Sequence, residues 1–207
     1  PPDVNRSDDR FTVEPEGIRF GLVAIKNIGR GFIQSVVRER QLGGDFRSLQ
    51  DFCDRMYDCG DMNKRAVENL IRSGAFDSMG ARRSQLLAVY EKVLDGIGSV
   101  RRRNVEGQID FFGMSAANST VETVVMPDIP EFTATERMHM EKETTGLYLS
   151  GHPMVGYRGA ARSSGAVTLN EILEDVSSEE GPTRFADGMP VTVAGIVASS
   201  KTRPTKN

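Results

Sequence analysis

The chain has 207 residues, of which 38% are hydrophobic, enough for one ordinary domain with appendages or for two small ones. No apolar run approaches the roughly 20 residues that span a bilayer, and the start lacks the regions of a signal peptide, so we expect a cytoplasmic protein with no membrane partner. The net charge of −3 excludes a uniformly basic nucleic-acid binder, but residues 19–103 hold 16 Lys or Arg against 10 Asp or Glu, and a polyanion is expected there.

Two short β-prone segments open the chain. Residues 11–14 and 17–20 are separated by Pro15, which is typical of a small hairpin or an extended entry. Pro1 stands where an initiator Met would be, and no helix or strand closes the chain at Asn207. We therefore expect a fragment of a longer protein.

Apolar residues then recur at helical spacing on both sides of Gly29-Arg30-Gly31. The pattern predicts a helix, a tight glycine turn and a second helix. Two glycines let the backbone turn sharply, and the N–H groups that open the second helix suit a phosphate oxygen. A plain helix–helix turn is the alternative. The apolar residues are Leu22, Ile25, Ile28, Ile33, Val36 and Val37.

Three more helices are predicted before residue 104. Ser48 is a good N-cap for a helix through Met56, and Asn63 caps another that breaks at residues 73–76. A long helix is then expected over about residues 82–103. A duplication of the helix–turn–helix is therefore indicated. The second copy matches the pattern less well, because its turn has one glycine where the first has two.

After residue 103 the composition becomes rich in Asn, Gly, Ser and Thr, which predicts a linker through residue 125. Thr133, with Glu136 three residues later, predicts a capped helix to about residue 145. A short helix is expected around residues 169–176. Residues 190–197 alternate or run apolar as a strand should, so a β domain is expected to begin there.

Metal chemistry finds no support in the sequence. Cys53 and Cys59 have no second cysteine pair and no histidine near them, so neither a zinc site nor a disulfide framework is predicted. Four aspartates at helical or near-helical spacing favour a solvated acidic face over a metal site: Asp51, Asp54, Asp58 and Asp61.

The pattern from Leu22 through Gly29-Arg30-Gly31 to Arg40 resembles the helix-hairpin-helix motif. That resemblance implies sequence-indifferent binding to the DNA backbone by hairpins that work in pairs. Residues 70–76 followed by Arg82-Arg83-Ser84 would be the partner copy. The DNA-binding residues implied are Lys26, Asn27, Gly29, Arg30, Gly31, Lys64, Arg65, Gly74, Arg82, Arg83 and Ser84.

An aromatic pair stands alone in the polar linker, within Gln108-Ile109-Asp110-Phe111-Phe112. Such a pair is expected to fill a pocket, either on a partner or on its own domain. The five residues resemble the sliding-clamp-binding pentapeptide. By that resemblance Gln108 bonds at the pocket rim, while Ile109, Phe111 and Phe112 enter the pocket as an extended peptide.

Several separated motifs keep one order along the chain and resemble the bacterial DNA polymerase III alpha subunits, DnaE type. They are residues 1–7, 17–26, 63–77 and Thr145-Gly146 with Ser150-Gly151-His152-Pro153. The resemblance implies the end of the fingers region at 1–20, a tandem helix-hairpin-helix domain at 21–104 and a linker with the clamp peptide at 105–126. A connecting helix at 127–158 and an incomplete OB-fold at 159–207 would follow.

The predicted fold is therefore mainly α: a tandem helix-hairpin-helix domain with a short N-terminal β-hairpin, a linker helix and the first strands of a truncated OB-fold. The resemblance implies a segment that gives a replicative polymerase processivity, with duplex DNA, the beta sliding clamp and other replisome subunits as partners. Magnesium is expected only in the parent's catalytic palm. We expect no catalytic residue and no cofactor in these 207 residues.

Three questions stay open from the sequence. The parent could be the main replicase or an error-prone relative of the same type. The chain could instead be a repair-associated helix-hairpin-helix protein, which would need its own catalytic cluster. It could also be a protein-interaction module in which Gly29-Arg30-Gly31 is merely a turn.

Overall fold

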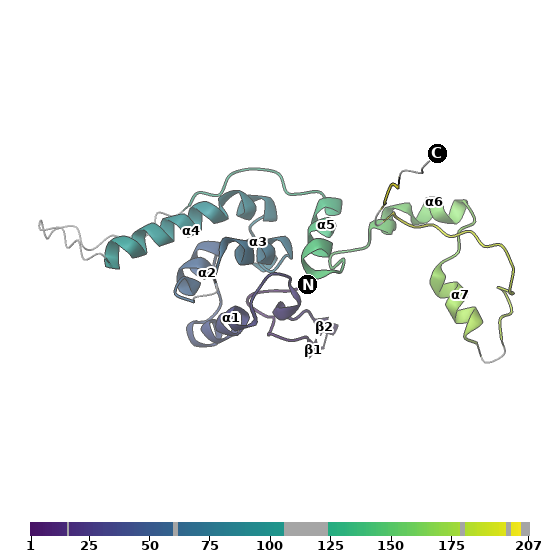
Figure 1. Cartoon of the computed structure of the whole chain (residues 1–207), viewed down its shortest axis with the longest axis horizontal. Coiled ribbons are helices and arrows are strands. Elements are labelled where there is room, and N and C mark those ends of the chain that lie inside the picture. The colour runs from purple at the N-terminus through teal and green to yellow at the C-terminus, as the bar shows by residue number, and fades with distance from the viewer. Residues whose placement is uncertain (16, 60–61, 106–123, 179–180, 198–199, 204–207) are drawn as a thin grey trace, which may run out of the picture. The chain divides into compact units, whose positions relative to one another are not determined.

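Helices dominate the part of the chain that the computed structural model describes: residues 1–15, 17–59, 62–105, 124–178, 181–197 and 200–203 (Figure 1). The mainly α fold predicted from the sequence is confirmed. The chain divides into two compact units, residues 1–150 and 151–207, and each is described by itself.

The first unit begins with a β-hairpin, as predicted. Its two strands pair antiparallel, with Val13 opposite Ile18. Helices joined by loops follow in the described part of this unit. The elements are β1 (Thr12–Glu14), β2 (Gly17–Arg19), the 3-10 helix η1 (Leu22–Ala24), α1 (Arg30–Gly43), α2 (Leu49–Met56), α3 (Lys64–Arg72), the 3-10 helix η2 (Asp77–Met79), α4 (Arg83–Val105) and α5 (Ala134–Thr145).

Side-chain caps set the starts of α2, α3 and α5, and all three were predicted. The side chains of Ser48 and Asn63 accept hydrogen bonds from the amides of the third helical residues, Asp51 and Ala66. Thr133 and Glu136 form a reciprocal capping box at α5. Because each cap satisfies amides that the helix itself leaves unbonded, these positions fix where the helices begin.

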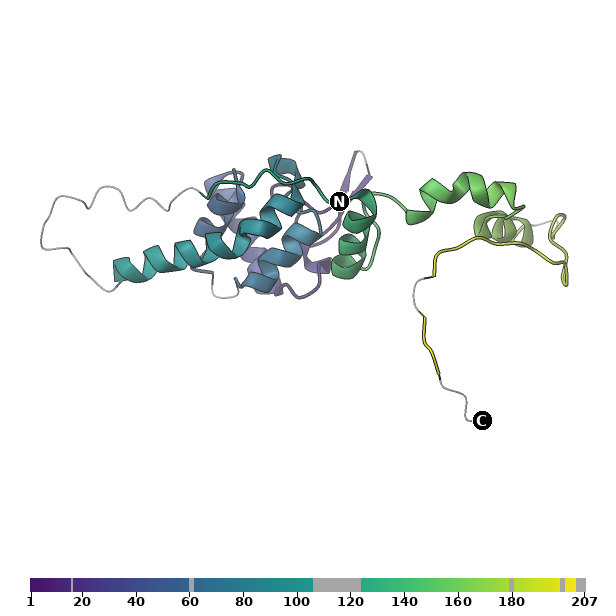
Figure 2. The same cartoon turned by 90° about the horizontal axis from the view of Figure 1, so that it is seen from above.

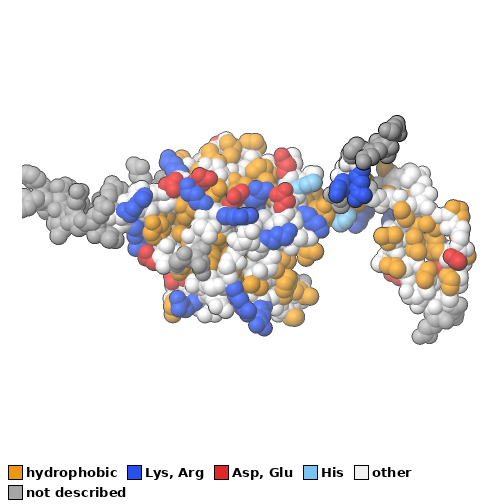
Figure 3. All heavy atoms as spheres, in the orientation of Figure 1, with side chains coloured by type: hydrophobic (Ala, Val, Ile, Leu, Met, Phe, Trp, Pro, Cys, Tyr) orange, Lys and Arg blue, Asp and Glu red, His pale blue; other side chains and the backbone are white. Residues whose placement is uncertain are grey.

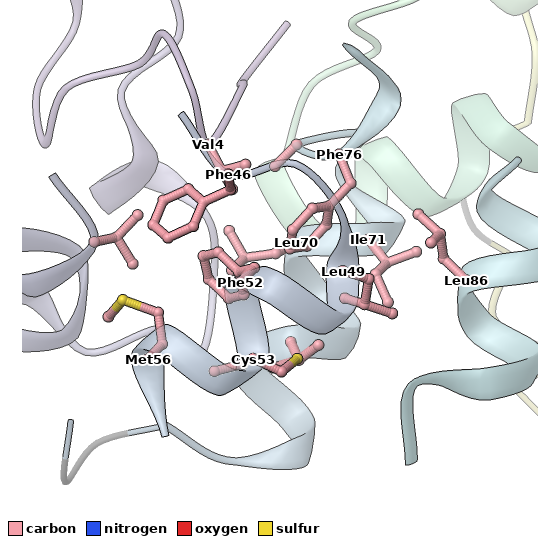
Figure 4. Close-up of a cluster of buried hydrophobic side chains, with 14 of the residues drawn as sticks. Val4, Phe46, Leu49, Phe52, Cys53, Met56, Leu70, Ile71, Phe76 and Leu86 are labelled. Atoms are coloured by element: carbon pink, nitrogen blue, oxygen red, sulfur yellow. The ribbon is translucent and has the colours of Figure 1, made fainter. Parts of the chain in front are cut away.

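The core of the first unit is built around Phe52 of α2 (Figure 4). Its ring makes edge-to-face contacts with Phe46 and Phe76, at centroid distances of 4.9 and 5.0 Å. Helix α4 buries one face against this core, including Leu86 and Ile97. The C-terminal turns of α4 extend past α2 and α3 in both cartoon views (Figures 1 and 2).

The helix predicted from Leu22 to Ile28 is wrong. Only the single turn η1 forms, and Ile25 is already extended, at φ −79° and ψ 125°. Leu22 and Ile25 are both buried, so their spacing serves one turn of 3-10 helix as well as it serves an α-helix. Lys26 then bonds to distant parts of the chain: its N–H donates to Thr144 O and its carbonyl accepts from Asn69.

In the part of the second unit that the structure describes, there are one 3-10 helix and two α-helices, followed by a C-terminal stretch without regular secondary structure. Its elements are η3 (Pro153–Tyr157), α6 (Arg158–Ser163) and α7 (Leu169–Val176). Helix α7 has the predicted bounds, and Thr168 caps it together with Glu171.

The strand predicted at residues 190–197 does not form in this structure. A strand needs a neighbour along its length. Among the described residues this stretch has one backbone bond to another part of the unit, from Val167 N–H to Thr192 O. The start of an OB-fold at residues 159–207 therefore stays a prediction.

Candidate nucleic-acid interface

The turn at residues 26–31, the first predicted site, leads into α1. Asn27 has φ +61° and is the only non-glycine residue with positive φ in the described ranges. Gly29 is extended, at φ −67° and ψ 139°, and is the N-cap of α1, while Gly31 lies in the first turn of that helix. Asparagine tolerates the left-handed region better than most residues, so Asn27 reverses the chain where the sequence pointed to the glycines.

The left-handed conformation makes the stability of the turn sensitive to residue 27. Asn27→Ala is expected to lower the free energy of unfolding by about 1 kcal/mol, because a Cβ without a compensating polar group crowds the following carbonyl. Asn27→Gly should change that energy by less than about 0.5 kcal/mol, since glycine adopts positive φ freely. Urea unfolding of both variants measures the difference. Equal stability of the two variants would contradict a left-handed residue 27.

The N-terminus of α1 is open. No side chain caps it through Gly29, its first turn contains no acidic residue, and residues 29–31 are exposed. By contrast, α2 and α3 begin at capped positions. An uncapped helix start presents unbonded N–H groups and the positive end of the helix dipole to solvent. That arrangement is suited to an anion such as a phosphate oxygen.

Two cations flank this open end. Arg30 is more than half exposed, and its guanidinium lies 3.7 Å from the carboxylate of Asp9. Lys26 Nζ donates to the backbone carbonyl of Glu143 at 2.9 Å, and Lys26 forms none of the ion pairs found in the described residues. Over the first unit as a whole, Lys and Arg are interspersed with Asp and Glu on the face drawn in Figure 3. The turn therefore differs from the rest of the surface of the first unit more by its backbone geometry than by its density of positive charge.

The predicted contacts at the start of α3 differ from each other. Lys64 Nζ pairs with Asp95 at 3.1 Å and with Glu91 at 3.4 Å, both on α4. The hydrogen bond to Asp95 is the main cause of a raised pKa of Lys64. The ammonium group of Lys64 is therefore already paired with carboxylates of α4. Arg65 is exposed and forms no ion pair among the described residues. Arg65 is the better placed of the two for a phosphate.

The second predicted turn is closed by a carboxylate of this chain. Gly74 has φ +85° and makes the turn toward α4. Glu131 accepts hydrogen bonds from the amides of Arg83, at 2.9 Å, and Ser84, at 3.1 Å. Burial opposes ionisation of Glu131, but these amides and that of Phe132 outweigh it and lower its pKa, so it remains an anion at neutral pH. Glu131 thus occupies the start of α4, where the corresponding start of α1 is open.

Two of the side chains at the start of α4 are buried, those of Arg83 and Ser84. Arg83 is 2% exposed and pairs with Asp77 at 2.7 Å and with Glu141 at 3.0 Å. Ser84 is 6% exposed. Arg82 stays at the surface, donating to Ile129 O at 2.7 Å. Because both side chains are buried, a phosphate on the surface would reach Arg82 more readily, and the DNA contacts at Arg83 and Ser84 stay a prediction.

The predicted clamp peptide, Gln108-Ile109-Asp110-Phe111-Phe112, lies outside the described residues. Within the described ranges, no three His, Cys, Asp or Glu side chains are grouped so that they could hold a metal ion. Asp54 and Asp58 of the predicted acidic face pair with Arg101 of α4. None of the described helices combines the length and apolar character needed to cross a membrane.

Three residues near the turns were not singled out from the sequence: Asn69, Glu131 and Glu141. Asn69 could have been found, because it is a polar residue on the face of α3 that buries Ala66 and Leu70. Glu131 and Glu141 have no such local signal. Their partners at the start of α4 lie 48 and 58 residues away in the chain.

A family model described as helix-hairpin-helix motif matches residues 1–86, which include the Lys26–Gly31 turn and α3. Over its whole length, the chain is 34% identical to DNA polymerase III subunit alpha of Deinococcus radiodurans and 35% identical to that of Thermus aquaticus. It is 38% identical, over 99% of its length, to that of Pseudomonas aeruginosa. The chain spans 15%, 16% and 18% of these relatives, so it matches one segment of each.

Proposed function

The chain is related over its full length to one segment of the bacterial DNA polymerase III alpha subunits, and on that premise we propose that it grips duplex DNA and tethers the polymerase to a sliding clamp. The grip is made to backbone phosphates, without base specificity. The tether turns repeated rebinding into an intramolecular event, which is processivity. Neither role involves a catalytic step at these residues.

The observation that carries the DNA-binding proposal is the open N-terminus of α1. It lies within the residues that the helix-hairpin-helix model matches, and it combines unbonded amides with the cations Lys26 and Arg30. The start of α4 offers no equivalent, because Glu131 fills it. We therefore assign the phosphate contact to the first turn, with Arg65 as an additional exposed cation.

Measuring duplex affinity of the chain against salt concentration tests this proposal. Affinity is expected to fall by about tenfold or more between about 50 and 200 mM salt, and to be equal for duplexes of unrelated sequence, because each neutralised phosphate releases counterions. Arg30→Ala should weaken binding and reduce the slope of log affinity against log salt by about 1.

Arg38→Ala is the matched control, since Arg38 is exposed on the same helix two turns farther on. It removes the same charge and leaves the turn intact. Equal losses in both variants would contradict the assignment to the turn. Absence of duplex binding at low salt would contradict DNA binding altogether and favour a protein-interaction module.

The clamp-binding part of the proposal rests on Gln108-Ile109-Asp110-Phe111-Phe112, by its similarity to the clamp-binding pentapeptide. Two large aromatic side chains are suited to a preformed apolar pocket, and the glutamine supplies a polar contact at its rim. The peptide follows the DNA-binding domain directly in the chain. Its position would let one polymerase hold DNA and clamp together.

A further inference from the structure

We propose that Asn69 is a positioning residue that holds the Lys26–Gly31 turn in the conformation that binds DNA. This inference rests on the proposed function of that turn. Asn69 lies on α3 and does not belong to the turn, and it is 8% exposed. It would act through the backbone of Lys26 and need not touch DNA.

Asn69 donates from its side-chain amide to the carbonyl of Lys26, with Nδ2 and O 2.9 Å apart. A buried amide without a partner is unfavourable, so this bond specifies where the Lys26 carbonyl must lie. Lys26 immediately precedes Asn27, the left-handed residue at which the chain reverses. The bond therefore fixes the peptide group on the N-terminal side of the reversal.

Helix α5 holds the other side of Lys26. The Lys26 N–H donates to Thr144 O at 2.8 Å, and Lys26 Nζ donates to Glu143 O at 2.9 Å. Glu143 is itself paired with Arg72 of α3. Both backbone polar groups of Lys26 are thus bonded to helices distant in sequence, and neither peptide group next to its Cα can rotate without losing a tertiary hydrogen bond.

This anchoring has a consequence for the open end of α1. Only three residues separate Lys26 from Arg30, so the direction of the first amides of α1 follows from the conformation held at Lys26 and Asn27. A turn fixed before DNA arrives does not have to be ordered on binding. If the anchor is lost, only a fraction of molecules is competent to bind, and the apparent affinity falls by that fraction.

Asn69→Ala is expected to weaken duplex binding of the chain by about tenfold, the loss that follows if about one molecule in ten keeps the competent turn. Ser73→Ala is the matched control. Ser73 is fully buried near the end of the same helix and donates to Leu70 O at 2.9 Å. Its loss removes one buried hydrogen bond away from Lys26, so it should lower stability and leave affinity unchanged.

The outcomes of this comparison separate the two proposals. If wild-type chain fails to bind duplex, the proposed function fails. If wild type binds and Asn69→Ala binds equally well, the positioning role alone is overturned. Equal affinity losses in Asn69→Ala and Ser73→Ala would also overturn it, because the effect would then follow general stability.

Asn69→Asp supplies a second test that does not depend on Asn69→Ala folding. A protonated carboxyl has the shape of the amide and can donate to Lys26 O, whereas a carboxylate cannot. Affinity relative to wild type is expected to be low at about pH 8 and to recover toward about pH 5, since burial raises the pKa of an aspartate. Full affinity at pH 8, or a deficit that does not shrink on acidification, would overturn the proposal.

Discussion

Glu141→Ala is expected to lower the free energy of unfolding by about 3–5 kcal/mol, because it leaves Arg83 as a buried charge with one partner fewer. Glu141 is fully buried and Arg83 is 2% exposed. The same carboxylate accepts from the amides of Leu149, at 2.9 Å, and Ser150, at 2.8 Å. One side chain of α5 therefore joins the start of α4 to the last residues of the first unit. Urea unfolding measures the loss.

A double variant distinguishes the buried ion pair from simple loss of packing. Arg83→Met combined with Glu141→Leu removes both charges and fills the space with apolar side chains of similar volume. It should therefore lower the free energy of unfolding by less than Glu141→Ala alone. The amides of Leu149 and Ser150 lose their acceptor in both cases, so recovery is expected to be partial. A double variant less stable than Glu141→Ala would contradict this account.

The same pair gives a pH dependence with a definite sign. Burial alone would raise the pKa of Glu141, but the hydrogen bonds from the amides of Ser150 and Leu149 and from Arg83 outweigh it, and the pKa lies below its ordinary value of 4.5. The contribution of ionised Glu141 to the free energy of unfolding is therefore complete above pH 4.5. It is lost as the pH falls through the lower pKa of the folded state. Glu141→Gln should flatten this acid limb of the stability profile.

Loss of clamp binding is the second large expected effect. Phe111→Ala combined with Phe112→Ala should weaken binding of this chain to the clamp of the same organism by about a hundredfold or more, because buried aromatic anchors dominate such interfaces. Surface plasmon resonance with immobilised clamp measures it. Duplex DNA affinity of the same variant should remain at the wild-type value.

Phe11→Ala is the control for a general loss of aromatic surface. Phe11 is half exposed beside the N-terminal hairpin, far in the chain from residues 108–112. It should leave clamp affinity unchanged. Unchanged clamp affinity in the Phe111 and Phe112 double variant would contradict the peptide assignment and leave the DNA-binding proposal intact.

The local elements of the fold were predictable because their signals are short in range. The caps at Ser48, Asn63 and Thr133 each bond an amide three residues on, so the sequence contains both partners within one turn. The short helix α7 was predictable for the same reason. The conformation of residues 22–28, before the glycine turn, was not predictable. Leu22 and Ile25 fit either a 3-10 turn or an α-helix, and the distant partners of Lys26 decide between them.

In the candidate site too, features set by neighbouring residues were predictable, and features set by distant contacts were not. The sequence by itself determined that residues 26–31 form a turn into a helix, with Arg30 at its start, because glycines, cations and apolar spacing are properties of neighbouring residues. Only the tertiary structure decided which charges and amides remain exposed. Arg83 is matched by Glu141, 58 positions away, and the start of α4 is filled by Glu131, 48 positions away. Whether a charge is exposed or buried depends on what folds against it, and the residues next to it in the chain do not specify that.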